Sequence, residues 1–156
     1  MLAAVVAVGA TPAIPLPDAA TPIASVQAGG VQIYRCAAAV AGTPLWTLDH
    51  PVATLYRDDG SVFGSHGAGP MWKAADGSTI VADGNVPITR IVQTGAVPWL
   101  ALRVTAHTGP GVLADARYVE RFDTRGGVAP DASDCTTSTI GAVRAVHYSA
   151  VYEFFR

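Results

Sequence analysis

The residues best suited to chemistry lie in one stretch, GSHGAGPMWKAADGS at positions 64–78, which combines a histidine, a tryptophan and several glycines. Glycines at this density let the backbone approach a ligand closely, and they also occur where a strand ends in a turn. His66, Gly69, Pro70 and Trp72 are therefore candidates for a binding corner, with an exposed tryptophan as the platform for a sugar ring or a flat aromatic ligand. The alternative is a structural corner, in which Trp72 belongs to the core and His66 caps a tight turn.

The four histidines of the chain are the candidates for a metal centre, because imidazole is a common metal ligand. None of His50, His66, His107 and His147 shows H-x-H or H-E-x-x-H spacing, so a metal site would have to be assembled by the fold. A metal-dependent or hydrolytic enzyme using His66, His107 or His147 with an aspartate is one hypothesis. The simpler interpretation is that these are surface or turn histidines.

Other catalytic patterns are weak. No G-x-S-x-G nucleophile motif occurs, and the aspartates of the Asp-Gly dipeptides suit tight turns rather than a glycosidase pair. The sequence therefore names no catalytic residue and implies no cofactor.

The elements that position these residues are indicated by alternation of apolar and polar side chains. The period is two residues in the segments 31–36, 52–57, 98–107 and 146–155, and turn dipeptides such as Asp-Gly separate the runs. This pattern predicts an all-β, single-domain antiparallel β-sandwich or barrel. Trp99, on the polar face of 98–107, is a further candidate binding residue.

Composition limits the class of protein. The chain has 156 residues, of which 50% are hydrophobic and 14% charged, with a formal net charge of −2. It is long enough for one core, and it has no basic stripe for nucleic acid or an anionic membrane. We expect a single β domain over 24–156, preceded by an apolar, Pro/Ala-rich arm or secretion-signal remnant over 1–23.

Cys36 and Cys135 lie 99 positions apart, and two cysteines at this separation suit one disulfide. Two unrelated buried thiols in a cytosolic protein are the alternative. The run LAAVVAV at 2–8 resembles the tail of a secretory signal, although it lacks a basic n-region and is too short to span a bilayer. Together these features favour export, to an extracellular or periplasmic location.

Several motifs in this order resemble a family of secreted bacterial and fungal proteins catalogued as a domain of unknown function. They are VQIY-x-C from 31, H-x-x-GP-x-W from 66, VPWL from 97, GG-x-AP from 126, and Cys135. The resemblance covers roughly residues 24 to 156 and implies an exported protein in which Cys36 and Cys135 are paired. It implies no catalytic residue.

Some fungal members of that family carry a malate dehydrogenase label, which would require a dinucleotide site. The nearest pattern is GPGVLA at 109–114, where a fingerprint glycine turn would have to open a helix. Only about six residues precede the next strand-like run, and a parallel crossover takes about a dozen or more. The segment is therefore expected to be a hairpin loop.

The sequence favours non-catalytic binding of a small molecule or polymer, carbohydrate or aromatic, at a loop-rich end near Trp72. An enzyme built on the histidines is the alternative, and a structural protein of the cell envelope or extracellular matrix is the second alternative. The oligomeric state is not indicated.

Overall fold

The computed structural model describes residues 13–17 and 19–156. Its strands confirm the all-β prediction, and the 3-10 helix η1 is the only helix among the described residues. The elements are β1 (Pro22–Ala37), β2 (Leu45–Tyr56), β3 (Val62–Gly67), β4 (Met71–Ala74), β5 (Thr79–Ala82), β6 (Thr89–Gln93), β7 (Ala96–Thr108), β8 (Tyr118–Gly126), η1 (Ala132–Asp134) and β9 (Val143–Phe155).

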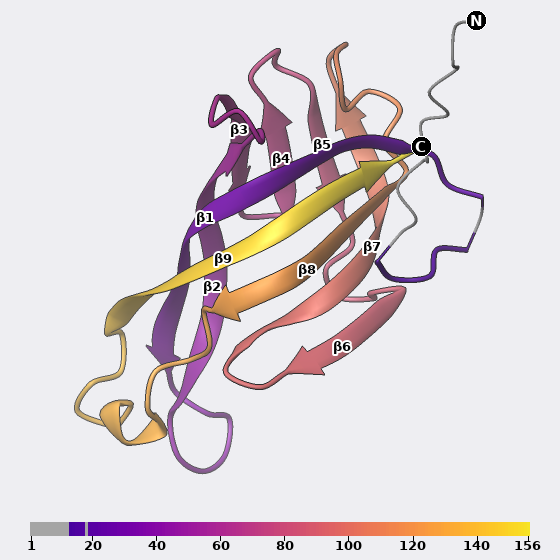
Figure 1. Cartoon of the computed structure of the whole chain (residues 1–156). Coiled ribbons are helices and arrows are strands. Elements are labelled where there is room, and N and C mark those ends of the chain that lie inside the picture. The colour runs from indigo at the N-terminus through magenta and orange to yellow at the C-terminus, as the bar shows by residue number, and fades with distance from the viewer. Residues whose placement is uncertain (1–12, 18) are drawn as a thin grey trace, which may run out of the picture.

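The strands form one antiparallel sheet that curls into a near-ring (Figure 1). Its order is β5-β4-β3-β2-β1-β9-β8-β7-β6, and β5 also pairs with β7, with Ile80 opposite His107. This additional pairing joins the two ends of the sheet and leaves β6 outside the ring, beside β7. Of the two expected architectures, the chain adopts the barrel.

Tight strand pairing depends on small residues at defined positions. Gly30 on β1 lies opposite Ala53 on β2, and a Cβ at this glycine would overlap the Val52 carbonyl oxygen and the Ala53 backbone. Glycine is therefore required here for the close approach of two backbones.

The inward side chains of β1 divide the interior of the ring into three parts. Val26 and Ala28 belong to the main hydrophobic core, Gln32 and Tyr34 line a cavity, and Cys36 lies in a separate cluster with Trp46 and Cys135. The interior is thus packed at one end, hollow in the middle and closed again at the disulfide. The largest fully buried apolar side chains of the main core are Trp72, Tyr152, Phe154, Leu55, Ile80 and Leu113.

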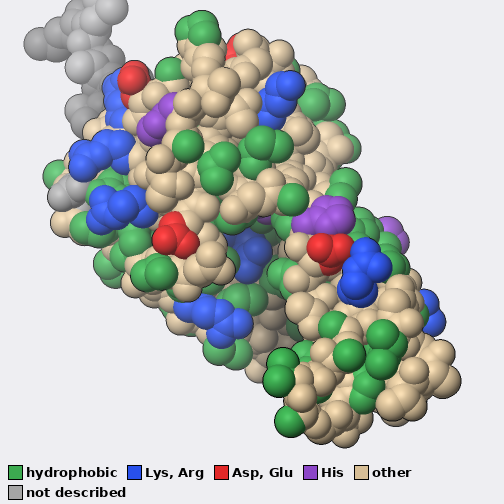
Figure 2. Space-filling view, turned by 180° about the vertical axis from the view of Figure 1, so that it is seen from behind, with side chains coloured by type: hydrophobic (Ala, Val, Ile, Leu, Met, Phe, Trp, Pro, Cys, Tyr) green, Lys and Arg blue, Asp and Glu red, His purple; other side chains and the backbone are tan. Residues whose placement is uncertain are grey.

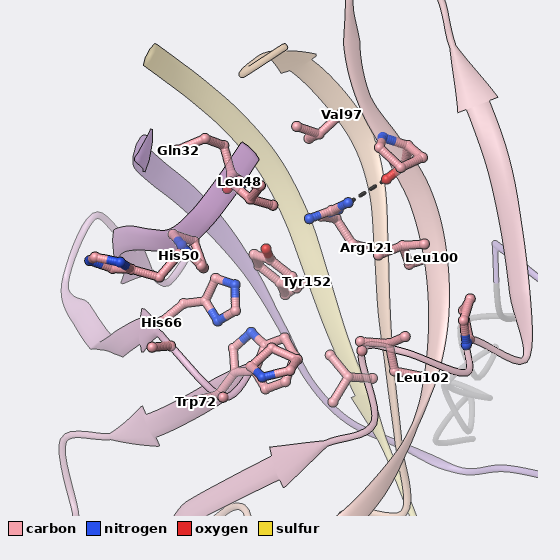
Figure 3. Close-up of a pocket in the computed structure, with 18 of the residues that line it drawn as sticks. Gln32, Leu48, His50, His66, Trp72, Val97, Leu100, Leu102, Arg121 and Tyr152 are labelled. Atoms are coloured by element: carbon pink, nitrogen blue, oxygen red, sulfur yellow. Dashed lines mark hydrogen bonds between the residues drawn. The ribbon is translucent and has the colours of Figure 1, made fainter. Parts of the chain in front are cut away.

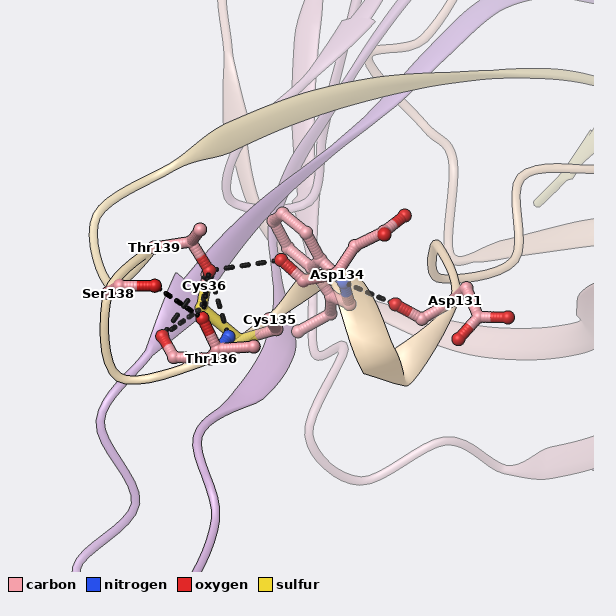
Figure 4. Close-up of a disulfide and its surroundings, with 8 residues drawn as sticks. Cys36, Asp131, Asp134, Cys135, Thr136, Ser138 and Thr139 are labelled. Carbon is pink, nitrogen blue, oxygen red and sulfur yellow. Dashed lines mark hydrogen bonds between the residues drawn. A yellow bond between two sulfur atoms is a disulfide. The ribbon is translucent and has the colours of Figure 1, made fainter.

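The predicted disulfide is present between Cys36 and Cys135, with a Cα–Cα distance of 5.4 Å (Figure 4). It joins the end of β1 to the loop that follows η1. Just before η1, the Asp131 carbonyl oxygen accepts a hydrogen bond from the indole N–H of Trp46 on β2, at 3.0 Å. The disulfide and this hydrogen bond hold the long β8–β9 connection against β1 and β2.

Part of the expected N-terminal arm lies against the outer face of the sheet. The Glu120 carboxylate accepts hydrogen bonds from the backbone N–H groups of Ala13 and Ile14, at 3.0 and 3.1 Å. Both Ile14 and Glu120 are fully buried. The signal-like run at 2–8 lies outside the described residues, and β1 begins within the expected arm, at Pro22.

The GPGVLA segment forms part of the loop between the antiparallel neighbours β7 and β8, which agrees with the expected hairpin. The Val112 N–H in this loop donates to the Asp76 carboxylate at 2.7 Å. No helix in the described ranges is long and apolar enough to cross a membrane.

Candidate functional site

A cavity of about 680 Å³ occupies the hollow part of the ring (Figure 3). Its wall is built from β1, β2, the β3–β4 corner, β7, β8 and β9, so segments far apart in the sequence contribute side chains. Figure 2 shows a hollow in the molecular surface with Lys or Arg side chains inside it. The inner wall combines the apolar side chains Val97, Leu100, Leu102 and Val119 with the polar or aromatic side chains Gln32, Tyr34, His66, Trp72, Arg121 and Tyr152.

The predicted corner between β3 and β4 forms one side of this cavity. His66 and Trp72 are register partners on the two strands, and their rings stack with centroids 4.4 Å apart and planes 13° apart. Between them, Gly69 has φ +143 and precedes Pro70 through a cis peptide bond. Only glycine adopts such a φ readily, so this residue allows the chain to turn between the strands.

His66 is 5% exposed, and its Nδ1 lies 2.9 Å from the Met71 carbonyl oxygen. Because a carbonyl only accepts, Nδ1 carries the proton and Nε2 of the neutral ring is an acceptor. Burial is the main cause that lowers the pKa of His66, to about 4; the hydrogen bond to Met71 opposes the shift and the Arg121 charge adds to it. His66 is therefore a neutral stacking and accepting group at physiological pH.

Arg121 points from β8 into the cavity, and its Nε donates to the Pro98 carbonyl oxygen at 3.0 Å (Figure 3). Among the described residues, no carboxylate forms an ion pair with this guanidinium. The acid in the cavity wall, Asp49, lies 3.4 Å from the Arg35 guanidinium and 3.7 Å from His50 Nδ1. The cavity thus contains a positive charge whose Nη atoms remain available.

Two buried polar atoms of the wall have no hydrogen-bond partner in the described part of the chain. They are Gln32 Oε1, an acceptor, and Trp72 Nε1, a donor. Most buried polar groups in proteins are satisfied, and these two atoms are exceptions that have almost no accessible surface of their own. By contrast, the Tyr34 hydroxyl donates to the Gly127 carbonyl oxygen at 2.6 Å, which fixes its ring at the cavity wall.

Four of the five predicted binding residues line this cavity, namely His66, Gly69, Pro70 and Trp72. Trp72 is only 1% exposed, which corrects the expectation of an exposed platform, and His66 lies within β3 rather than at a turn. Trp99 does not line the cavity; its ring packs edge-on against Phe122 with centroids 6.2 Å apart.

Sequence reasoning missed Gln32, Tyr34, Arg121 and Tyr152. Gln32 and Arg121 are polar residues at inward positions of their strands, two residues from buried apolar or aromatic neighbours. A polar residue at an inward position of an otherwise apolar strand is the signal that could have identified them.

Of the four histidines, His50 and His66 line the cavity, whereas His107 and His147 lie elsewhere. The exposed His107 donates from Nε2 to the Ala116 carbonyl oxygen at 2.6 Å, and His147 is exposed on β9. Over 13–17 and 19–156, no group of three or more His, Cys, Asp or Glu side chains is arranged to hold a metal ion.

Comparison with known proteins places the chain in a family. Residues 17–156 match the family described as a protein of unknown function, DUF3455, and the chain belongs to it. No curated protein and no solved structure matches the chain.

Proposed function

We propose that this protein is an exported, non-catalytic binding protein that holds a small molecule with a flat apolar body inside the ring. The observation that carries the proposal is the cavity of about 680 Å³, which lies within the usual range of roughly 300–1,000 Å³ for small-molecule sites. Such sites combine an apolar wall with a few polar groups that orient the ligand. Here the Arg121 guanidinium, which projects into the cavity, supplies such a group.

The form of the cavity favours a small molecule over a polymer. A polysaccharide site usually presents aromatic rings on an open surface, where a chain can pass on both sides. Trp72 is instead buried against His66 and Tyr152, so it presents no open ring face on the surface. A compact aromatic or alicyclic molecule fits this arrangement.

The chemistry of the wall favours binding over catalysis. The residues that line the cavity include no serine, threonine, cysteine or lysine that could act as a nucleophile. His66 is oriented by the Met71 carbonyl oxygen rather than by a carboxylate, and its low pKa makes it a weak base. These features support positioning and recognition of a ligand.

The disulfide supports export, because such bonds persist in oxidising compartments. The cavity and the disulfide cluster share strand β1, so the bond also stabilises the wall that carries Gln32 and Tyr34. An extracellular or periplasmic binding protein is the role that we propose.

Isothermal titration calorimetry with naphthamide, a neutral aromatic probe, tests the proposal. We expect saturable binding of one molecule per chain with a Kd of roughly 10 μM to 1 mM, as ligand efficiency suggests for a probe of this size. Leu100→Trp fills the cavity and should abolish binding, whereas Val92→Trp, at an exposed position of β6, should leave it unchanged. Absence of saturable binding to the wild type by naphthamide and by its acid naphthoate would overturn the proposal.

A further inference from the structure

We propose that the ligand of this cavity is an organic anion with a single negative charge, such as a carboxylate on an aromatic body, and that Arg121 binds its charge. This inference rests on the proposed function and specifies the class of ligand. Three observations carry it: an uncompensated cation, its fixed orientation, and the apolar side chains around it.

The charge balance of the cavity favours an anion. Arg121 is partly buried, and no carboxylate of the described residues forms an ion pair with it. Asp49, the acid of the wall, is held by Arg35 and His50 at the rim. Because a partly desolvated cation without a counter-ion is unfavourable, an anion that enters the cavity gains both a charge partner and hydrogen bonds.

The orientation of Arg121 suits a carboxylate. Its Nε is held by the Pro98 carbonyl oxygen, and Figure 3 shows the guanidinium projecting into the space between Tyr152 and Leu48. The two Nη atoms remain for a ligand, and a guanidinium binds the two oxygens of a planar carboxylate with particular strength.

The number of cations favours a single charge. The other arginine that lines the cavity, Arg90, is exposed on β6 at the rim. A phosphate dianion is usually held by several cations or by a cluster of backbone N–H groups, and the inner wall offers Arg121 alone. Val97, Leu100 and Leu102 surround this charge with apolar surface, which is suited to the ring of an aromatic acid.

The test compares naphthoate with naphthamide, which have the same shape and differ in charge. At neutral pH we expect the wild type to bind naphthoate at least about tenfold more tightly than naphthamide, because an ionised acceptor strengthens the hydrogen bonds. Arg121→Gln should weaken naphthoate binding about 10- to 100-fold and change naphthamide binding less than about twofold. Arg125→Gln, an exposed arginine on the same strand, is the matched control and should change neither.

The outcomes separate the inference from the function on which it rests. Equal affinity of the wild type for acid and amide would overturn the anion proposal and leave the binding function standing. The same conclusion would follow if Arg121→Gln weakened both probes equally. The acid-to-amide ratio of the wild type decides the matter even if the variant fails to fold, and circular dichroism establishes whether it folds.

Discussion

His66 and Trp72 face each other across β3 and β4, with stacked rings whose centroids are 4.4 Å apart. Tyr152 packs against both, at 5.0 Å from the His66 centroid and 5.6 Å from that of Trp72. The three rings form a continuous aromatic wall, contributed by the β3–β4 corner and by β9 at the centre of the sheet. The histidine of this wall, His66, has a lower pKa in the folded protein than in the unfolded chain because it is buried.

Protonation of His66 should destabilise the folded protein. Its pKa is lowered from 6.5 to about 4, so the unfolded chain binds the proton more tightly between these values and stability falls as pH falls through this window. The expected loss is about 2 kcal/mol between pH 7.5 and pH 5. His66→Phe retains the stacking and removes the titration. Urea unfolding at both pH values should show a smaller acid loss for the variant, and an equal loss would contradict the prediction.

Replacement of Gln32 by an apolar residue should not destabilise the free protein. Gln32 is 1% exposed, and its Oε1 has no partner among the described residues, so Gln32→Leu removes a buried unsatisfied acceptor while keeping the volume. We expect the variant to be equal to the wild type or more stable, by up to about 2 kcal/mol. Chemical denaturation measures this change. A loss of more than about 1 kcal/mol would show that the amide stabilises the free protein.

Gly69→Val should destabilise the corner whether or not a ligand is bound. The φ of +143 at Gly69 is strained for any residue with a β-carbon, so a loss of about 1–3 kcal/mol is expected. Gly67→Ala is the matched control, because a Cβ there meets nothing within 4 Å and its φ is not positive. Thermal melting of both variants tests this difference, and equal melting temperatures would refute it.

Loss of the disulfide should weaken the end of the molecule nearest the cavity. The double variant Cys36→Ala/Cys135→Ala removes a cross-link between residues 99 positions apart. Its free energy of unfolding should fall by about 2–5 kcal/mol, the usual contribution of a native disulfide.

The disulfide itself can be tested with a thiol assay. The unreduced, denatured wild type should contain no free thiol. Two reactive thiols per chain would contradict both the bond and its support for export.

Alternation predicted some strands correctly because it reports which face of a strand is apolar. In β9 alternation predicts that Val146, Tyr148, Ala150, Tyr152 and Phe154 share the inner face, and all of these except the half-buried Val146 are buried. In β1 the aliphatic residues of 31–36 are Val31 and Ile33, yet the structure buries Gln32, Tyr34 and Cys36. The polar side chain is tolerated there because it faces a cavity, and a cavity leaves no signal in the period of a strand.

Glu153 shows a second limit of the pattern. Alternation over 146–155 places Glu153 on the polar face, and it does lie on the outer face, but it is only 5% exposed. It pairs across the strands with Glu120, which holds the backbone of Ala13 and Ile14. Periodicity describes a strand and does not reveal which other segment covers it. The β3–β4 corner could be singled out because its glycine, proline and aromatic residues are adjacent in sequence, whereas Arg121 reaches the same cavity wall through tertiary structure alone.

The two glutamates should make stability depend on pH in the sense opposite to His66. Burial raises the pKa of both carboxyls; at Glu120 the hydrogen bonds from Ile14 and Ala13 oppose the rise and the charge of Glu153 adds to it. A raised pKa means that the folded state binds the proton more tightly than the unfolded chain. This tighter proton binding stabilises the folded state at low pH. The stabilisation is lost as pH rises above about 4.5 through the pKa that the carboxyl has in the folded state.

Glu153→Gln tests this relationship, because it removes one buried charge and leaves the Glu120 carboxylate in place to hold the N-terminal segment. We expect the melting temperature of the variant to exceed that of the wild type at pH 7.5, and the difference to shrink at pH 4, where both carboxyls become protonated. Glu120→Gln is the contrasting variant: its single carbonyl oxygen replaces two carboxylate oxygens that accept from Ala13 and Ile14. It should therefore increase amide hydrogen exchange at Ile14, which Glu153→Gln should not. A Glu153→Gln variant that is less stable than the wild type at pH 7.5 would show that the charge is compensated, and the proposed origin of the pH dependence would be wrong.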